Sequence, residues 1–212
     1  MLLRAPKVYS VYMNAKRREA AGHATADRLL RAGRRLLRAE GAEAVSMRRV
    51  AGAVGITAMA IYRHFPDRDS LLNALADEGF RELAERLRSR KYARGFGKRL
   101  VEMGNVYLEH ALENPRLFEL MFLRARRGAR QFPQDFKAGK SPTANVMIEA
   151  VQEGMRRGYF RKGDAWEVVF EMGALSHGLI LLYLGGRLAV SKERFREMYR
   201  AAFARYLRGM RK

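Results

Sequence analysis

The sequence of 212 residues contains no cysteine, which excludes disulfide bridges and thiolate metal sites. Its four histidines lie at positions 23, 64, 110 and 177, too far apart for a metal-ligand motif. It also lacks a G-x-S-x-G elbow, a Walker loop and a dinucleotide-binding fingerprint. These absences point away from an enzyme and indicate neither a cofactor nor a metal.

Long apolar runs and acidic residues are also scarce. The longest apolar run, GLILLYLGG (178–186), is far shorter than the ~18–20 residues of a membrane span, so no membrane insertion is expected. Together with the absence of cysteine, this favours the cytoplasm. The 22 acidic residues face 42 basic ones, giving a net charge of +20. Such an excess indicates a polyanionic partner: nucleic acid first, an anionic membrane surface second.

Helical periodicity runs through most of the chain, and no strand-like alternation persists, which predicts an all-α fold. The segment 24–40 places leucines on one face and an arginine stripe on the other, and the stripe is either solvated or partly in contact with phosphate. The further expected helices all follow from cap residues or apolar spacing; they are residues 68–89, 96–112, 116–126, 141–160, 164–188 and 191–208.

Two very short helices are predicted within SMRRVAGAVGITAMAIYRHF (46–65), the most informative segment of the chain. Ser46 and Thr57 stand at cap positions, each with the apolar spacing of a hydrophobic staple around it. Gly55 lies between them and can take the positive φ that ends the first helix. Two starts this close leave about two turns for each helix, as in helix-turn-helix DNA readers.

These patterns divide the chain into three parts. Residues 1–22 show no clear period and are expected to be a basic, mobile arm, in which Lys16, Arg17 and Arg18 either contact DNA or stay solvated. Residues 23–67 form the expected three-helix DNA-binding domain. Residues 68–212 form an expected C-terminal helical bundle for effector binding and dimerisation.

The run GITAMAIYRHFPDRDSLLNAL (55–75) closely resembles the TetR family of bacterial transcriptional regulators. The matching features are Gly55, the aliphatic residue before the second cap, the Tyr-x-His-Phe pattern that ends at Phe65, and a basic residue before a leucine pair. The resemblance covers about residues 24–87. Farther on, ALSHGLILL (174–182) is similar to a helix in one branch of the family that carries a His-Gly pair.

The resemblance implies a set of DNA contacts. Arg48 would reach a base, with a guanine edge as its natural bidentate target. Ser46 and the N-terminal amides of both short helices would meet phosphates, and Tyr62, His64 and Arg68 would bond the DNA backbone. The tip of the recognition helix, directly after Thr57, consists of Ala58, Met59 and Ala60. These apolar side chains can contact thymine methyl groups but cannot form hydrogen bonds with bases, so base recognition by hydrogen bonds is left to Arg48 and Arg63. Burial in the core is the alternative role for Tyr62 and the expected one for Phe65, while His64 has an equally good alternative in a local backbone carbonyl.

The C-terminal part is expected to bind an effector and to dimerise. Segments 164–188 and 191–208 are too apolar or aromatic to be fully buried in one small domain, so pairing with a second copy is expected; a purely internal core is the alternative. Methionine-rich apolar helices suggest a largely apolar effector. For both histidines a structural role is the favoured alternative. Polar side chains on these helices are the candidate contacts: Asn105, Tyr107, His110, Trp166, Glu171, His177 and Tyr183.

The predicted function is a ligand-responsive repressor. It would bind a pseudo-palindromic operator as a homodimer, with half-sites about 34–36 Å apart, and a small-molecule effector would release it. A non-specific architectural nucleic-acid-binding protein is the alternative, since the net charge alone would also suit that role.

Overall fold

The computed structural model describes the backbone of residues 7–211 and the side chains of residues 22–211. This part of the chain consists of helices and connecting turns, and its only β pairing is an isolated bridge between Phe160 and Arg211. The predicted all-α fold is therefore confirmed. The backbone divides into two compact units, residues 1–75 and residues 76–212, which are described separately.

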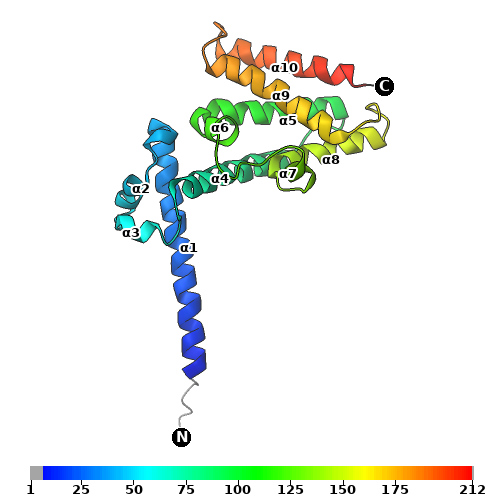
Figure 1. Ribbon diagram of the computed structural model, residues 1–212. Coiled ribbons are helices and arrows are strands. Elements are labelled where there is room, and N and C mark those ends of the chain that lie inside the picture. The colour runs from blue at the N-terminus through cyan, green and yellow to red at the C-terminus, as the bar shows by residue number, and fades with distance from the viewer. Residues whose placement is uncertain (1–6, 212) are drawn as a thin grey trace. The chain divides into compact units, whose positions relative to one another are not determined.

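The first unit is built on helix α1 (Lys7–Glu40), followed by a short 3-10 turn η1 (Ala42–Ala44), α2 (Met47–Val54), α3 (Ala58–Ile61) and the start of α4 (Arg68–Ser89) (Figure 1). Its core side chains come from every one of these α-helices and are essentially inaccessible to solvent: Leu29, Leu37, Val50, Ile61, Leu71, Leu72 and Leu75. Because the first turns of α4 supply three of these leucines, the unit extends to Leu75, beyond the boundary predicted at residue 67.

Helix α1 is longer than predicted. It begins at Lys7 rather than near Ala24, so the backbone of residues 7–22 is helical although the sequence shows no clear period there. The basic, mobile arm expected over residues 1–22 stays a prediction. The stretch between Lys7 and Ala21 holds neither glycine nor proline, so no helix-breaking residue interrupts α1 there. Residues 1–6 and the side chains of Lys16, Arg17 and Arg18 lie outside the described part of the chain.

The second unit continues from α4 and surrounds helix α5 (Phe96–Glu113), which contacts four other helices. These are α6 (Pro115–Phe122), α8 (Pro142–Arg156), α9 (Ala165–Leu184) and α10 (Lys192–Gly209). Predicted caps are confirmed at Ser141, Asp164 and Ser191, whose side-chain oxygens each accept a backbone N–H of the first helical turn. The short helix α7 (Gln134–Lys137) lies in a stretch for which the sequence predicts no helix.

Close packing between α5 and α10 fixes one side of this unit. A Cβ atom at Gly104 would lie 3.1 Å from the ring of Phe203, so any larger residue there would push this ring outward by a few tenths of an ångström. Tyr199, also on α10, is fully buried and donates a hydrogen bond of 2.8 Å to Ser176 on α9. Helices α9 and α10 consequently lie side by side as a pair against α5 (Figure 1).

Helix α9 remains largely exposed within the single chain. By length and composition alone α9 could cross a membrane, since its most apolar stretch has a mean hydropathy of 1.4. Only 22% of this stretch is buried within the single chain. Its large exposed side chains include Phe170 at 52% and Leu182 at 46%. The expectation of no membrane insertion is based only on the uninterrupted apolar run 178–186. Helix α9 as a whole is longer than this run, because it also includes the stretch that contains Glu167 and Glu171.

Candidate nucleic-acid interface

Helices α2 and α3 begin where the sequence predicts. The Ser46 hydroxyl accepts from the backbone N–H of Arg49 at 3.3 Å and caps α2, and the Thr57 hydroxyl accepts from Ala60 at 3.2 Å and caps α3. Gly55 takes φ 76°, the left-handed conformation that ends α2, as predicted. Helix α3 is shorter than the expected two turns, because after Ile61 the chain passes into turns that lead to Phe65.

The short α3 is held in place by two apolar side chains. Ile61 is fully buried and Phe65 is 7% exposed, so the core role predicted for Phe65 is confirmed. On the opposite side, Ala58 is exposed and Met59 is 75% exposed, while Tyr62 is 49% exposed. A methionine this exposed at a helix tip has no packing role within the chain, which makes this face of α3 suited to contact another molecule.

Arginines around α2 divide into bound and unbound side chains. Arg49 forms a two-pronged ion pair with Glu40 at 2.7 and 2.9 Å, and this hydrogen bonding raises the pKa of Arg49. Arg48 and Arg63 are exposed and make no hydrogen bond or ion pair with any residue between 22 and 211. These two are therefore the side chains of this surface that are free to reach base edges or phosphates.

Two further arginines hold α2 in place. Arg28 on α1 donates to the carbonyl of Val54 at 2.9 Å, at the end of α2. Arg68 on α4 donates to the carbonyls of Val45 at 2.8 Å and Ala42 at 2.7 Å, and pairs with Glu43 at 3.3 Å. The guanidinium predicted to bond DNA is thus engaged with the chain's own backbone. Sequence periodicity places both residues on helix surfaces and gives no signal for these long-range bonds.

Each predicted DNA-contact residue lies in one continuous segment around α2 and α3. Ser46 and His64 are partly buried, Thr57 is exposed, and Ala60 is partly buried at the end of the α3 tip. Together the short capped helices, the left-handed glycine and the outward α3 tip are the geometry of a helix-turn-helix.

Comparison with known proteins decides the family. The signature described as "Bacterial regulatory proteins, tetR family" matches residues 29–75, and "Tetracyclin repressor-like, C-terminal domain" matches residues 100–206. The chain belongs to the TetR family. The resemblance seen in residues 24–87 is confirmed, and the second signature extends the likeness across the C-terminal unit.

Similar proteins include "HTH-type transcriptional regulator Rv1816" of Mycobacterium tuberculosis, 26% identical over 152 residues. That match covers 70% of this chain and 64% of the regulator, less than two thirds of its length. A solved structure of a protein with unknown function from Rhodococcus sp. RHA1 has 27% identity and a TM-score of 0.74, covering 88% of this chain and 95% of that one. A TetR variant from Acinetobacter baumannii AYE, crystallised in complex with minocycline, shares the fold at 18% identity and a TM-score of 0.63, covering 85% and 93%.

The TetR-family C-terminal unit brings together two of the seven predicted effector residues. The hydroxyl of Tyr107 on α5 forms a hydrogen bond with Nε2 of His177 on α9, and both rings pack against Phe118 and Phe122. Burial lowers the pKa of His177 to about 4 and raises the pKa of Tyr107. At neutral pH the phenol is therefore protonated and donates to a neutral imidazole.

The other predicted effector residues are dispersed within the described part of the unit. His110 is fully buried on α5, and Tyr183 stacks on Phe195 with ring centroids 4.1 Å apart. Glu171 accepts a hydrogen bond of 2.5 Å from Tyr206, and Trp166 lies in the first turn of α9. Asn105 lines a polar groove instead. The structure thus assembles no single pocket from the seven residues.

Proposed function

We propose that this protein is a cytoplasmic, DNA-binding transcriptional repressor that binds a pseudo-palindromic operator as a dimer and releases it when a small molecule binds. The main support is the tip of α3, which begins at the Thr57 cap and is anchored by the buried Ile61. Met59 on this tip is 75% exposed, so most of its side chain is available to contact DNA. Family membership supports it, since TetR-family members bind DNA as dimers and bind small-molecule ligands.

Within this proposal each exposed side chain has a role set by its chemistry. Arg48 reads a base by bidentate hydrogen bonds, and Arg63 adds a second cationic contact. Met59 with its flanking alanines meets thymine methyls. Tyr62, His64, Ser46 and Thr57 contact phosphates, together with the N-terminal amides of α2 and α3. Arg68 positions α2 through the carbonyls of Val45 and Ala42, and contributes to DNA binding mainly in this way.

Dimerisation through α9 and α10 is proposed from the exposed apolar surface of α9. Phe170, Leu181, Leu182 and Leu184 are each more than a third exposed in the single chain. Isolated apolar surface of this kind is unfavourable in water by about 25 cal/mol per Å². A second copy that packs its own α9 and α10 on this surface forms a four-helix interface and removes it from water.

The effector is proposed to bind in the C-terminal unit and to favour a dimer whose α3 helices no longer match the operator. Support comes from the minocycline complex of the A. baumannii TetR variant, in which a protein of the same fold binds a small molecule. The Tyr107–His177 pair with its aromatic neighbours is one candidate for contacts with an apolar ligand.

A selection experiment tests the function. Selection of duplexes from a random pool should yield one pseudo-palindromic site that binds at least ~10³-fold more tightly than bulk DNA. Arg48→Ala should weaken binding to this site by about 1–3 kcal/mol and relax the base preference, whereas Arg88→Ala, an exposed arginine on α4, should do neither. Equal affinity for all duplexes with a steep salt dependence would instead identify a non-specific architectural protein.

A further inference from the structure

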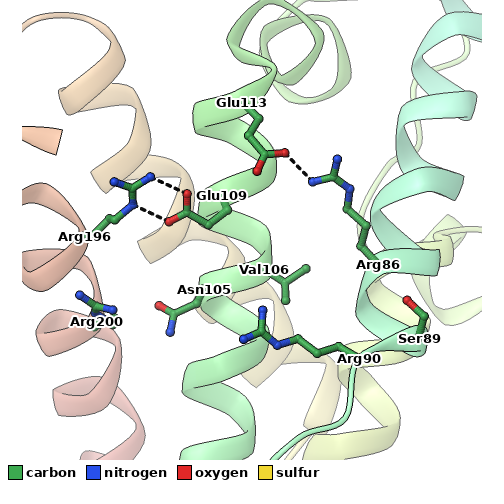
Figure 2. A pocket seen from close by; sticks show the side chains of 9 residues that line it. All are labelled: Arg86, Ser89, Arg90, Asn105, Val106, Glu109, Glu113, Arg196 and Arg200. Carbon is green, nitrogen blue, oxygen red and sulfur yellow. Dashed lines mark hydrogen bonds and ion pairs between the residues drawn. The ribbon is translucent and has the colours of Figure 1, made fainter. Parts of the chain in front are cut away.

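A polar groove of about 530 Å³ lies over α5, between the end of α4 and helix α10 (Figure 2). Its volume falls within the range of about 300–1,000 Å³ that is usual for small-molecule sites. The lining is almost entirely polar or charged, in contrast to the apolar site expected from the sequence. The lining residues are Arg86, Ser89, Arg90, Asn105, Val106, Glu109, Glu113, Arg196 and Arg200.

Two of the four arginines are neutralised by the glutamates of α5. Arg196 holds Glu109 with two bonds of 2.6 and 2.8 Å, and Arg86 holds Glu113 at 2.7 Å. Hydrogen bonding from Arg196 lowers the pKa of Glu109, so this carboxylate stays ionised at neutral pH. Both ion pairs join neighbouring helices to α5 and fix the walls of the groove.

The guanidinium groups of Arg90 and Arg200 keep their hydrogen-bond donors unused. Neither forms a hydrogen bond or an ion pair with any residue in the described range 22–211. Figure 2 shows the two guanidinium groups on opposite sides of the groove with the amide of Asn105 between them, while Ser89 lies at the backbone end of Arg90. Glu82 and Glu193 also pair with Arg86 and Arg196, at 3.3 and 3.4 Å. Glu109 attracts Arg200 without bonding to it, so Arg90 and Arg200 keep their N–H donors unused around one polar floor.

We propose that this groove binds a small molecule with at least two anionic oxygen-rich groups, phosphates or carboxylates, held between Arg90 and Arg200 above Asn105. Guanidinium groups bind both kinds of anion through paired N–H donors, and the amide of Asn105 adds a donor and an acceptor at the floor. The site deepens the proposed function and rests on it for one point. The bound anion, rather than an apolar ligand at the Tyr107–His177 pair, is the effector that changes operator affinity.

Calorimetric titration of the full-length protein without DNA tests the site. Pyrophosphate and citrate serve as probes at constant ionic strength, and the probe that binds distinguishes a phosphorylated ligand from a polycarboxylate. The variant Arg90→Gln/Arg200→Gln should bind that probe at least tenfold more weakly. The control Arg88→Gln/Arg205→Gln removes the same charge from exposed positions nearby in the sequence and should bind within twofold of the parent protein.

Two results would overturn the site. One is the absence of saturable binding for both probes; the other is an equal loss of affinity in both double variants, which would mean that the anions respond only to net charge. The proposed function fails in a different measurement, namely selection of an operator by the protein without any probe. A protein that selects an operator and binds neither probe keeps its function and loses this site.

Discussion

Replacing Arg68 by lysine keeps the positive charge but removes the guanidinium fork that bonds Val45 and Ala42 at 2.8 and 2.7 Å. A hydrogen bond from a charged group contributes about 1.5–3 kcal/mol. The Arg68 side chain is 36% exposed, and lysine can restore one of the two bonds, so the lower part of that range applies. We expect local opening of the η1–α2 region to become easier by about 2 kcal/mol, which corresponds to roughly 30-fold faster amide exchange.

Hydrogen exchange of peptides that span residues 42–54 measures this opening directly. Arg63→Lys is the matched control, because Arg63 is exposed and makes no hydrogen bond or ion pair with the rest of the described chain, and its exchange should match that of the parent protein. Operator affinity should fall for Arg68→Lys, because α2 is no longer held in position. Unchanged exchange together with unchanged operator affinity would refute the positioning role and return Arg68 to simple phosphate contact.

Three further substitutions have definite expected outcomes. Gly55→Ala forces a Cβ into φ 76° and should destabilise the first unit by about 1 kcal/mol in urea unfolding. Phe170→Glu should shift a dimer to monomers in sedimentation, whereas Leu123→Glu, 40% exposed but outside α9 and α10, should leave it intact. His177 has its pKa lowered to about 4 by burial, below the unfolded value of about 6.5, so its stabilising contribution is present above pH 6.5 and is lost as the pH falls toward 4. The free energy of unfolding should drop by about 2 kcal/mol more between pH 7.5 and 5 in the parent protein than in His177→Gln; an equal drop would show that His177 protonates freely in the folded state.

Local signals in the sequence predict the helix-turn-helix well. Ser46, Gly55 and Thr57 determine where α2 ends and where both short helices begin, through short-range hydrogen bonds and one left-handed backbone conformation, and the structure shows each of them in that role. Apolar spacing likewise identifies Ile61 and Phe65 as buried. These features depend on residues only a few positions apart, so one sequence is enough to predict them.

Contacts between residues far apart in the sequence could not be predicted from it. Arg196 meets Glu109 across 87 positions and Tyr107 meets His177 across 70, and no periodicity in either helix indicates such a partner. The start of α1 escapes prediction for another reason, since the sequence before Ala24 shows no clear helical period. The groove around Asn105 depends on three helices that come together only in the folded unit.

Arginines that bind their own chain change what the charge of +20 means. Arg28, Arg49 and Arg68 surround α2, yet each is occupied by a backbone carbonyl or a glutamate of the same unit. Arg28 and Arg68 keep their positive charge when they bond carbonyls, so they still attract a duplex at long range, but their bonded N–H donors are not available to its phosphates. These three side chains therefore act on DNA mainly by holding α2 in place, and close contacts with the duplex are left to arginines such as Arg48 and Arg63.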